Sequence, residues 1–455
     1  MPTFRNALET IGDTPLVEVT RLDTGPCRLF LKLENQNPGG SIKDRIALSM
    51  VDAAARDGRL RPGGTLVEAT AGNTGLGLAL VAAQKGYRLV LVIPDKMAQE
   101  KIFHLRALGA EVRMTRSDVG KGHPDYYQDV AERLAGEIDG AFYVNQFANP
   151  ANPEAHERAT GPEIWEQMDR RLDAVVVGVG SGGTLTGLGR FFRRVAPKVK
   201  MVLADPRGSI LAEKVRSGRL IEAGSWLVEG IGEDFVPPVC DLSLVGEALT
   251  IGDAESFATA RDLLRREGIL AGSSTGTLVA AALHYCRAQA TPQRVVSFVC
   301  DSGNKYLSKM FNDYWMIDQG FLERERHGDL SDLISRRHED RATVTVAPDD
   351  TLLFAYARMK LYDISQIPVL AAGEAVGIID ESDILVAVYD NEERFRERVA
   401  TAMTSKLDTI QAAAALRDLL PIFARDHVAI VKDGERFLGL ITRVDLLNHL
   451  RRRMK

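Results

Sequence analysis

The stretch "DAVVVGVGSGGTLTG" (173–187) contains the pattern that decides the fold. Its valine-rich first half is typical of a strand that is buried on both faces of a parallel sheet. The glycines and hydroxyl side chains that follow make a small-residue turn, and the residues after the turn fit the start of a helix. The stretch therefore predicts one strand–loop–helix unit of an α/β protein.

The same alternation of short apolar strands and amphipathic helices continues on both sides, from about residue 66 to residue 301. The other predicted strands are "RLVLVI" (88–93), "AEVRMT" (110–115), "VKMVLAD" (199–205) and "RVVSFVC" (294–300), and two of the predicted helices are "TGLGLALVAAQKG" (74–86) and "AESFATARDLLRREG" (254–268). This order predicts α/β layers, with helices on both faces of a sheet.

The chain changes character after Phe321, where residues 322–342 are strongly charged and predict a linker. Beyond it, "IPVLAAGEAVGIIDESDIL" (367–385) matches "VAIVKDGERFLGLITRVDLL" (428–447), and each reads as strand, turn, strand and short helix. This is an internal repeat of supersecondary size. We therefore predict an α/β domain at 1–322, a linker at 323–340 and a tandem of small α+β domains at 341–455.

The length, net charge and cysteine content of the chain argue against several classes of function. The chain has 455 residues, which suits two or three domains, and its formal net charge of -5 argues against nucleic acid or an anionic membrane as a partner. Four cysteines without C-x-x-C spacing predict reduced, buried thiols rather than disulfides or a metal site. The start of the chain has no signal pattern and no stretch has the length of a membrane span, so we expect a soluble cytoplasmic protein.

Three segments of the first domain place a small-residue turn at the start of a helix: "ATAGNTG" (69–75), "GVGSGGTLTG" (178–187) and "LAGSSTGT" (270–277). Such turns let the backbone approach a ligand closely and aim free N–H groups at an anion. Three of them in one domain favour an anionic ligand. The middle loop can cradle a single phosphate with the amides and hydroxyls of Gly180, Ser181, Gly182, Gly183 and Thr184.

The middle loop also fits a competing hypothesis, because "GVGSGG" has the spacing of a dinucleotide-binding fingerprint. Asp205 ends the next predicted strand, at about the distance expected for an acid that binds a ribose. A nicotinamide-dependent oxidoreductase is therefore an alternative. Against it, the fingerprint normally opens its domain, and the alternative leaves Lys43 and the other two loops without a role.

Lys43 stands in "NPGGSIKDR" (37–45), just after a glycine-rich turn at a predicted helix start. A helix N-terminus already carries partial positive charge, so a further cation is unfavourable there unless the lysine is neutral or has a chemical task. Ser41 and Asp44 have the spacing of a capping box, and Arg45 is expected to pair with a nearby carboxylate.

Asn73 and Ser274 each stand at a helix-opening turn, where capping is the commoner role for Asn and Ser. Beside a lysine and a phosphate cradle, we assign Asn73 to a ring oxygen and Ser274 to a ring nitrogen of a bound heterocycle. A lysine, a phosphate cradle and a hydroxyl that faces a pyridine nitrogen together suggest pyridoxal 5'-phosphate.

The motifs "IGDTPLV", "NPGGSIKDR", "TAGNTG", "GSGGTLTG" and "GSSTGT" occur in an order that resembles the pyridoxal-phosphate β-replacement enzymes, and the resemblance covers about Phe4 to Asp318. Within this family, "EGIGEDFVP" (229–237) and "DSGNKYLSKMFNDYW" (301–315) are similar to the cystathionine β-synthases rather than the cysteine synthases. The C-terminal repeat resembles the tandem regulatory domains that are named after the former.

The resemblance implies a fold-type-II catalytic domain with two α/β/α subdomains, and a homodimer or higher homo-oligomer. It implies that Lys43 holds the cofactor and moves the substrate's α-proton. The residues implied to bind the amino-acid substrate are Thr70, Ala71, Gly72, Asn73, Thr74, Gln146 and Gly230. The implied reaction condenses L-serine with L-homocysteine to cystathionine and water, with hydrogen sulfide released when cysteine is the donor. The alternative is a cysteine synthase that uses O-acetylserine and sulfide.

Some positions depart from the family pattern. Ala71 replaces a serine of the asparagine loop, and Phe147 and Glu233 stand where some relatives have tyrosine. The chain starts close to the catalytic domain, so no haem is expected.

In the C-terminal repeat, Thr442 and Asp445 stand where similar domains hold the ribose of an adenosine ligand such as S-adenosylmethionine. Helix capping by Asp445 and a role of the tandem in assembly alone are the alternatives. A third class of function is a nucleotide-sensing protein whose first domain has lost its activity.

Overall fold

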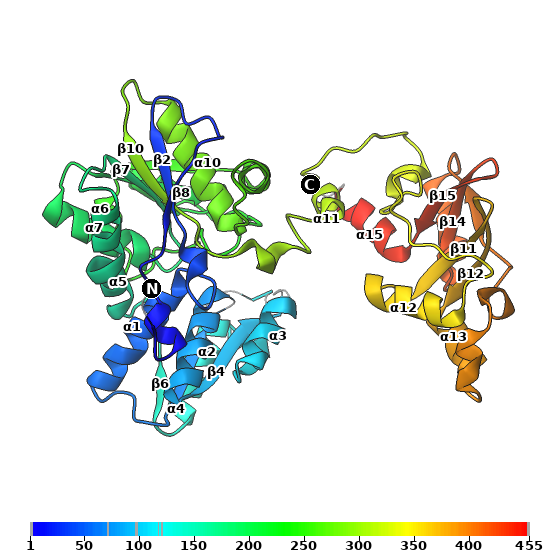
Figure 1. The fold of residues 1–455 in the computed structure, drawn as a ribbon, viewed down its shortest axis with the longest axis horizontal. Helices are drawn as coiled ribbons and strands as arrows, with labels where there is room; N and C mark the ends of the chain where they lie inside the picture. The colour runs from blue at the N-terminus through cyan, green and yellow to red at the C-terminus, as the bar shows by residue number, and fades with distance from the viewer. Residues whose placement is uncertain (1–2, 71, 96–98, 117, 120–121, 453–455) are drawn as a thin grey trace. The chain divides into compact units, whose positions relative to one another are not determined.

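The computed structural model describes residues 3–452 except 71, 96–98, 117 and 120–121. The chain divides into two compact units, Met1–Phe311 and Asn312–Lys455 (Figure 1). The predicted α/β class is confirmed, since the first unit is built from parallel strands that alternate with helices. The domain limits at 322 and 340 stay a prediction.

The larger sheet of the first unit has the strand order β1 (Leu16–Glu18), β2 (Arg28–Lys32), β10 (Arg294–Phe298), β7 (Ala174–Gly178), β8 (Lys200–Pro206), β9 (Glu247–Ile251). Neighbouring strands are parallel except for the antiparallel pair at the β1 edge. Residues 173–187 thus form β7 and the start of the helix that follows it. The central position of β7 explains its unbroken run of buried valines.

The smaller sheet has the order β5 (Glu111–Thr115), β4 (Arg88–Pro94), β3 (Thr65–Ala69), β6 (Ala141–Tyr143), and all of its pairs are parallel. Leu66 and Leu91 pack with α1 (Lys43–Arg56) and α2 (Asn73–Lys85) on one face. Val67 and Val92 pack with α4 (Tyr127–Glu137) on the other. Helices on both faces explain why these strands are apolar throughout.

The remaining helices of the first unit are α3 (Gln99–Ala107), α5 (Ala151–Ala155), the π-helix η3 (His156–Thr160), α6 (Gly161–Gln167), α7 (Gly183–Val195), α8 (Leu211–Ser217), α9 (Asp253–Asp262), the π-helix η5 (Leu263–Glu267) and α10 (Ser273–Arg287), with 3₁₀ turns η1 (Ala7–Thr10), η2 (Glu34–Gln36), η4 (Leu242–Leu244) and η6 (Gly303–Tyr306). Helix α10 contacts β2, β7, β8, β9 and β10, and nearly all of its residues are buried. It therefore forms the central cover of the larger sheet.

The second unit confirms the predicted repeat. One copy is β11 (Gln366–Ala371), β12 (Glu374–Asp380) and α13 (Glu381–Val388); the other is β14 (Ala429–Asp433), β15 (Arg436–Ile441) and α15 (Arg443–Arg452). Both hairpins have a register shift at the same place, after Val369 and after Val431. The other elements are α11 (Asp313–Gln319), η7 (Leu330–Leu333), α12 (Leu352–Tyr362), η8 (Glu392–Arg396), η9 (Val399–Thr401), β13 (Thr409–Gln411), η10 (Leu416–Leu419) and α14 (Leu420–Ala424).

The predicted linker contains η7, whose Leu330 and Leu333 are buried in the core of the second unit. This stretch is therefore partly packed despite its charge. None of the helices in the described part of the chain combines the length and the apolar composition that a membrane span requires.

Candidate functional site

A cavity of about 640 Å³ lies at the carboxyl ends of strands from both sheets of the first unit. It is lined by most of the residues that the sequence predicted: Lys43, Thr70, Gly72, Asn73, Thr74, Gln146, Gly180, Ser181, Gly182, Thr184, Gly230 and Ser274. Gly183 lies behind the lining, and Ala71 lies outside the described residues. The structure thus brings together segments that are more than 200 residues apart in the chain.

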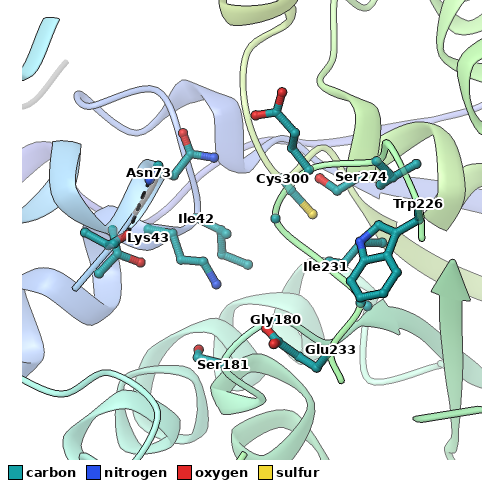
Figure 2. A pocket seen from close by; sticks show the side chains of 18 of the residues that line it. Ile42, Lys43, Asn73, Gly180, Ser181, Trp226, Ile231, Glu233, Ser274 and Cys300 are labelled. Atoms are coloured by element: carbon teal, nitrogen blue, oxygen red, sulfur yellow. Dashed lines mark hydrogen bonds between the residues drawn. The ribbon is translucent and has the colours of Figure 1, made fainter. Parts of the chain in front are cut away.

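Lys43 is the first residue of α1, and its side chain points into this cavity (Figure 2). Burial lowers the pKa of the Lys43 amine, although the nearby acidic groups Cys300, Glu233 and Asp301 act in the opposite direction. The amine has no hydrogen-bond partner within the described ranges. A desolvated lysine at a helix N-terminus is shifted toward its neutral, nucleophilic form, which resolves the electrostatic conflict seen in the sequence.

The predicted capping box at this helix start is wrong. The Ser41 hydroxyl accepts a hydrogen bond from the Lys43 N–H at 3.2 Å, whereas the Asp44 carboxylate accepts one from the Gly39 N–H at 2.6 Å. The Asp44 side chain therefore closes the glycine turn instead of the helix end. The prediction for Arg45 is confirmed, because its guanidinium pairs with Glu34 at 2.7 Å and Glu163 at 2.6 Å.

The turn before α7 has the properties of an anion cradle. Helix α7 begins at Gly183 with neither a side-chain cap nor an acidic residue in its first turn, so its first N–H groups are available to a ligand. A Cβ on Gly180 would lie 2.6 Å from the Gly230 carbonyl oxygen, and one on Gly182 would lie 2.4 Å from the Cys240 Cβ. These two positions therefore require glycine.

Gly183 has a supporting role. It lets α7 approach the fully buried Asn152, whose amide donates hydrogen bonds to the Gln146 carbonyl oxygen at 2.8 Å and to the Ser181 hydroxyl at 2.9 Å. Asn152, which the sequence analysis missed, thereby joins the cradle to a residue of the predicted substrate subsite.

His156 holds the Thr184 hydroxyl in the cradle. Its Nε2 lies 3.2 Å from Thr184 Oγ1, and its Nδ1 lies 3.0 Å from Thr160 Oγ1, at the other end of the π-helix. Burial lowers the pKa of His156 well below 6.5, so the ring is neutral. A neutral imidazole between two hydroxyls orients Thr184 without adding charge.

Ser274 lies in the first turn of α10, on the side of the cavity formed by the larger sheet (Figure 2). Its hydroxyl forms a hydrogen bond with Cys300, and burial raises the pKa of that thiol to about 12. Both groups are thus neutral near pH 7. No carboxylate occupies this position among the residues that line the cavity, so a ring nitrogen here would meet a hydroxyl.

Asn73 lines the cavity, but its side chain already has two protein partners. Its Nδ2 donates to Asp301 at 2.8 Å, and its Oδ1 accepts from the Lys305 ammonium at 2.7 Å. Asp301 also accepts from the Tyr306 hydroxyl at 2.8 Å. The ring-oxygen contact of Asn73 stays a prediction. Asp301 and Lys305 belong to the segment 301–315, which was used for the family resemblance and was not predicted to contribute to the site.

The predicted substrate loop is tied to the strand behind it. The Thr74 hydroxyl donates to the Gln146 side chain at 2.7 Å, and the Gln146 N–H donates to the carboxyl group of Glu68 at 3.3 Å. Glu68 is fully buried, and burial raises its pKa to about 8. A buried carboxyl group that the sequence analysis missed therefore positions the Gln146 backbone.

The acid of the dinucleotide hypothesis has another role. Asp205 is fully buried at the end of β8, where its carboxylate accepts a hydrogen bond from the Ala212 N–H at 2.8 Å and closes the turn into α8. It does not line the cavity. The interpretation of Asp205 as a ribose ligand is therefore wrong.

The donor set of the cavity fits pyridoxal phosphate. A desolvated amine at Lys43 can bond to the aldehyde, the uncapped N-terminus of α7 with Thr184 can hold the phosphate, and the Ser274 hydroxyl can face the ring nitrogen. Within the described ranges, no group of three or more His, Cys, Asp and Glu side chains is arranged to hold a metal ion.

In the second unit, Asp445 caps the start of α15. Its carboxylate accepts hydrogen bonds from the Thr442 N–H at 2.7 Å and the Thr442 hydroxyl at 2.6 Å, and also one from the Ser335 hydroxyl. In the first copy, Asp380 and Asp383 form a reciprocal capping box. The two predicted ligand residues of the second copy therefore lie together, in contact with each other.

Comparison with known proteins agrees with this site. Residues 7–301 match the model of the family described as pyridoxal-phosphate dependent enzyme, and residues 332–390 and 399–452 match that of the CBS domain. The cystathionine beta-synthase of Dictyostelium discoideum is 35% identical over 98% of this chain and 92% of its own length. Cysteine synthase A of Escherichia coli (strain K12) is 42% identical over 67% of this chain and 94% of its own.

A solved structure, that of a hydrogen sulfide-producing enzyme from Fusobacterium nucleatum, is 35% identical with a TM-score of 0.63, and the match covers 67% of this chain and all of that one. The match of residues 7–301 and the relative that is similar over both units establish the assignment. The chain therefore belongs to the family of pyridoxal-phosphate dependent enzymes, and within it to the cystathionine β-synthases.

Proposed function

We propose that this chain condenses L-serine with L-homocysteine to cystathionine and water. The observation that carries the proposal is the Lys43 amine, which is desolvated, has no hydrogen-bond partner among the described residues, and lies in a cavity with the proposed anion cradle and substrate loop. This chain is similar to a cystathionine beta-synthase over both the catalytic part and the tandem, which supports homocysteine as the thiol substrate.

The residues of the cavity divide the work of a β-replacement. Bound pyridoxal phosphate supplies the electron sink that makes the α-proton of the amino acid removable. Lys43 would hold the cofactor, and its free amine would carry the α-proton of the substrate and could protonate the departing hydroxyl group. The N–H groups of residues 70–74 and the Gln146 side chain bind the substrate carboxylate. Ser274 would present a hydroxyl to the ring nitrogen, and a hydroxyl would not force that nitrogen to hold a proton.

A cysteine synthase is the second candidate, because the catalytic part alone is 42% identical to cysteine synthase A. The purified protein should be supplied in parallel with serine plus homocysteine and with O-acetylserine plus sulfide, and the products should be compared by mass spectrometry. We expect cystathionine from the first pair at the higher kcat/KM. Cysteine as the faster product would reject our assignment in favour of the second candidate.

Two further properties belong to the proposal. With cysteine as donor, the same elimination releases hydrogen sulfide, in line with the activity named for the similar Fusobacterium nucleatum enzyme. We propose that an adenosine ligand such as S-adenosylmethionine binds at Thr442 and Asp445. The Asp445 carboxylate would then give up part of its hydrogen bonding to Thr442 and accept hydrogen bonds from the ribose hydroxyls instead. We further propose a cytoplasmic homo-oligomer without haem. Sedimentation with and without the adenosine ligand tests the assembly.

A further inference from the structure

Glu233 is held rigidly at the edge of the cavity by the loop that carries it. The flanking Gly230 and Gly232 have left-handed backbones, with φ of +86° and +87°. The Glu233 N–H donates to the Ser209 hydroxyl at 3.1 Å, and its carbonyl oxygen accepts from the Ile210 N–H at 3.1 Å. The main chain is therefore fixed, and the side chain lines the cavity on the side opposite Asn73 (Figure 2).

The Glu233 carboxyl group differs from the other acidic groups around the cavity. Glu229 pairs with the Lys309 ammonium at 2.6 Å, and Asp301 accepts hydrogen bonds from Asn73 and Tyr306. The carboxyl group of Glu233, in contrast, has no hydrogen bond or ion pair with any described residue. It is thus the cavity's carboxyl group that remains available to a substrate.

The charges around Glu233 favour its protonated form. Burial raises the pKa of Glu233 well above 4.5, the neighbouring Asp234 and the buried Asp205 raise it further, and Lys43 lowers it. The titratable groups that face Glu233 from its surroundings are Lys43, Tyr126, Tyr127, Asp205, Asp234 and Cys240. A carboxyl group whose pKa is raised toward neutral pH is, in its ionised form, a stronger base and is suited to accept a proton from a weak acid.

Three other titratable groups of the cavity, Cys300, Tyr127 and Lys43, are poorly suited to this task. Burial raises the pKa of Cys300 to about 12, and it raises that of Tyr127 as well, so both keep their protons near pH 7. Lys43 is occupied with the α-proton in the proposed function. The second substrate nevertheless arrives as a thiol, whose pKa near 8.5 leaves only a few per cent as thiolate at pH 7.

We propose that the Glu233 carboxylate removes the proton from the thiol of the second substrate. The S–H bond breaks, its electron pair stays on sulfur, and the proton moves to a Glu233 oxygen; the thiolate then forms the new bond to the β-carbon. The inference rests on the proposed function, which requires a thiol nucleophile. Binding of the substrate's ammonium group is the competing role for this carboxyl group, and a thiol that lacks the amine separates the two.

The test compares the Glu233→Gln variant with the wild-type holoenzyme, using homocysteine and an aromatic thiol that is already ionised across the pH range. We expect kcat/KM for homocysteine to fall by about 10²- to 10⁴-fold near pH 7, and kcat/KM for the aromatic thiol to stay within about twofold. The pH profile of the variant should follow the ionisation of the thiol itself. Glu222→Gln, an exposed substitution outside the cavity, is the matched control.

Two other results would overturn the proposal. An equal loss with both thiols would assign Glu233 a positioning role. A rise in KM that disappears with 4-mercaptobutanoate, which lacks the amine, would assign it to ammonium binding. The spectral change caused by serine alone should be unchanged in the variant, which reports an intact site. If the wild type makes no cystathionine, the proposed function fails, and the same comparison with cysteine as the thiol still tests Glu233.

Discussion

Replacing Gly183 by alanine should damage the proposed cofactor cradle, although Gly183 itself does not line the cavity. An ideal Cβ at this position would lie 1.8 Å from Asn152 Oδ1, whereas ordinary contacts begin at 3.4 Å, so the amide would have to retreat by about 1.6 Å. Asn152 is fully buried and holds the Gln146 carbonyl oxygen and the Ser181 hydroxyl. It therefore cannot retreat without losing both hydrogen bonds.

The magnitude follows from these contacts. Each lost hydrogen bond costs about 0.5–1.5 kcal/mol, and forcing an extra carbon into a packed site costs about 1–3 kcal/mol. We therefore expect Gly183→Ala to lower the free energy of unfolding of the catalytic unit by about 2–6 kcal/mol. Affinity for pyridoxal phosphate should fall by about tenfold or more, because the Ser181 hydroxyl and the first N–H groups of α7 shift together.

Urea unfolding of the apoprotein and a titration with pyridoxal phosphate measure the two effects. Gly136→Ala is the control: this glycine is exposed in α4, and nothing lies within 4 Å of its ideal Cβ, so the change should stabilise by about 0.5–1 kcal/mol at most. The double variant Asn152→Ala, Gly183→Ala should be little worse than Asn152→Ala alone. A Gly183→Ala protein with an unchanged unfolding midpoint would refute the reasoning.

Three further outcomes are expected. Lys43→Ala should abolish turnover and the visible absorption of the bound cofactor while leaving circular dichroism unchanged; an active variant would contradict the assignment. Burial alone would raise the pKa of Glu163, but its hydrogen bonds with Arg45 lower that pKa to about 2, from the usual value of 4.5. This contributes about 3 kcal/mol of stability above pH 4.5 that is lost as the pH falls toward 2, so Glu163→Gln should flatten that limb of acid unfolding. Asp445→Ala should abolish binding of S-adenosylmethionine in calorimetry; undiminished binding would place the ligand elsewhere.

The buried parallel strands could be predicted from sequence because each depends on its own composition. The apolar runs at 173–179, 199–205 and 294–300 form β7, β8 and β10 within two residues of their predicted bounds. Strand β2, "RLFLK" (28–32), was not predicted, since it lies before the alternation that begins near residue 66. Lys32 is fully buried there because it pairs with Glu163, more than a hundred residues away, and a local pattern cannot show such a partner.

The candidate site divides in the same way. Lys43 and the three glycine loops were found because each belongs to a short contiguous motif. The contact of Lys305 with Asn73 arises only when distant segments meet, and so does the lack of a partner for the Glu233 carboxyl group among the described residues. The sequence therefore carried no direct signal for either. Asp44 shows how a correct local pattern can mislead: its spacing fits a capping box, yet the glycine turn offers its carboxylate a closer donor at Gly39.

The pairing of β2 with β10 has a consequence for synthesis of the protein. These strands lie side by side in the larger sheet, with Arg28 opposite Arg294, although the ribosome makes them at opposite ends of the catalytic unit (Figure 1). Strand β2 can pair with β1 early, but the edge of β2 that faces β10 must stay unpaired until nearly 300 residues have emerged. The smaller sheet, whose strands all lie between Thr65 and Tyr143, can assemble long before that.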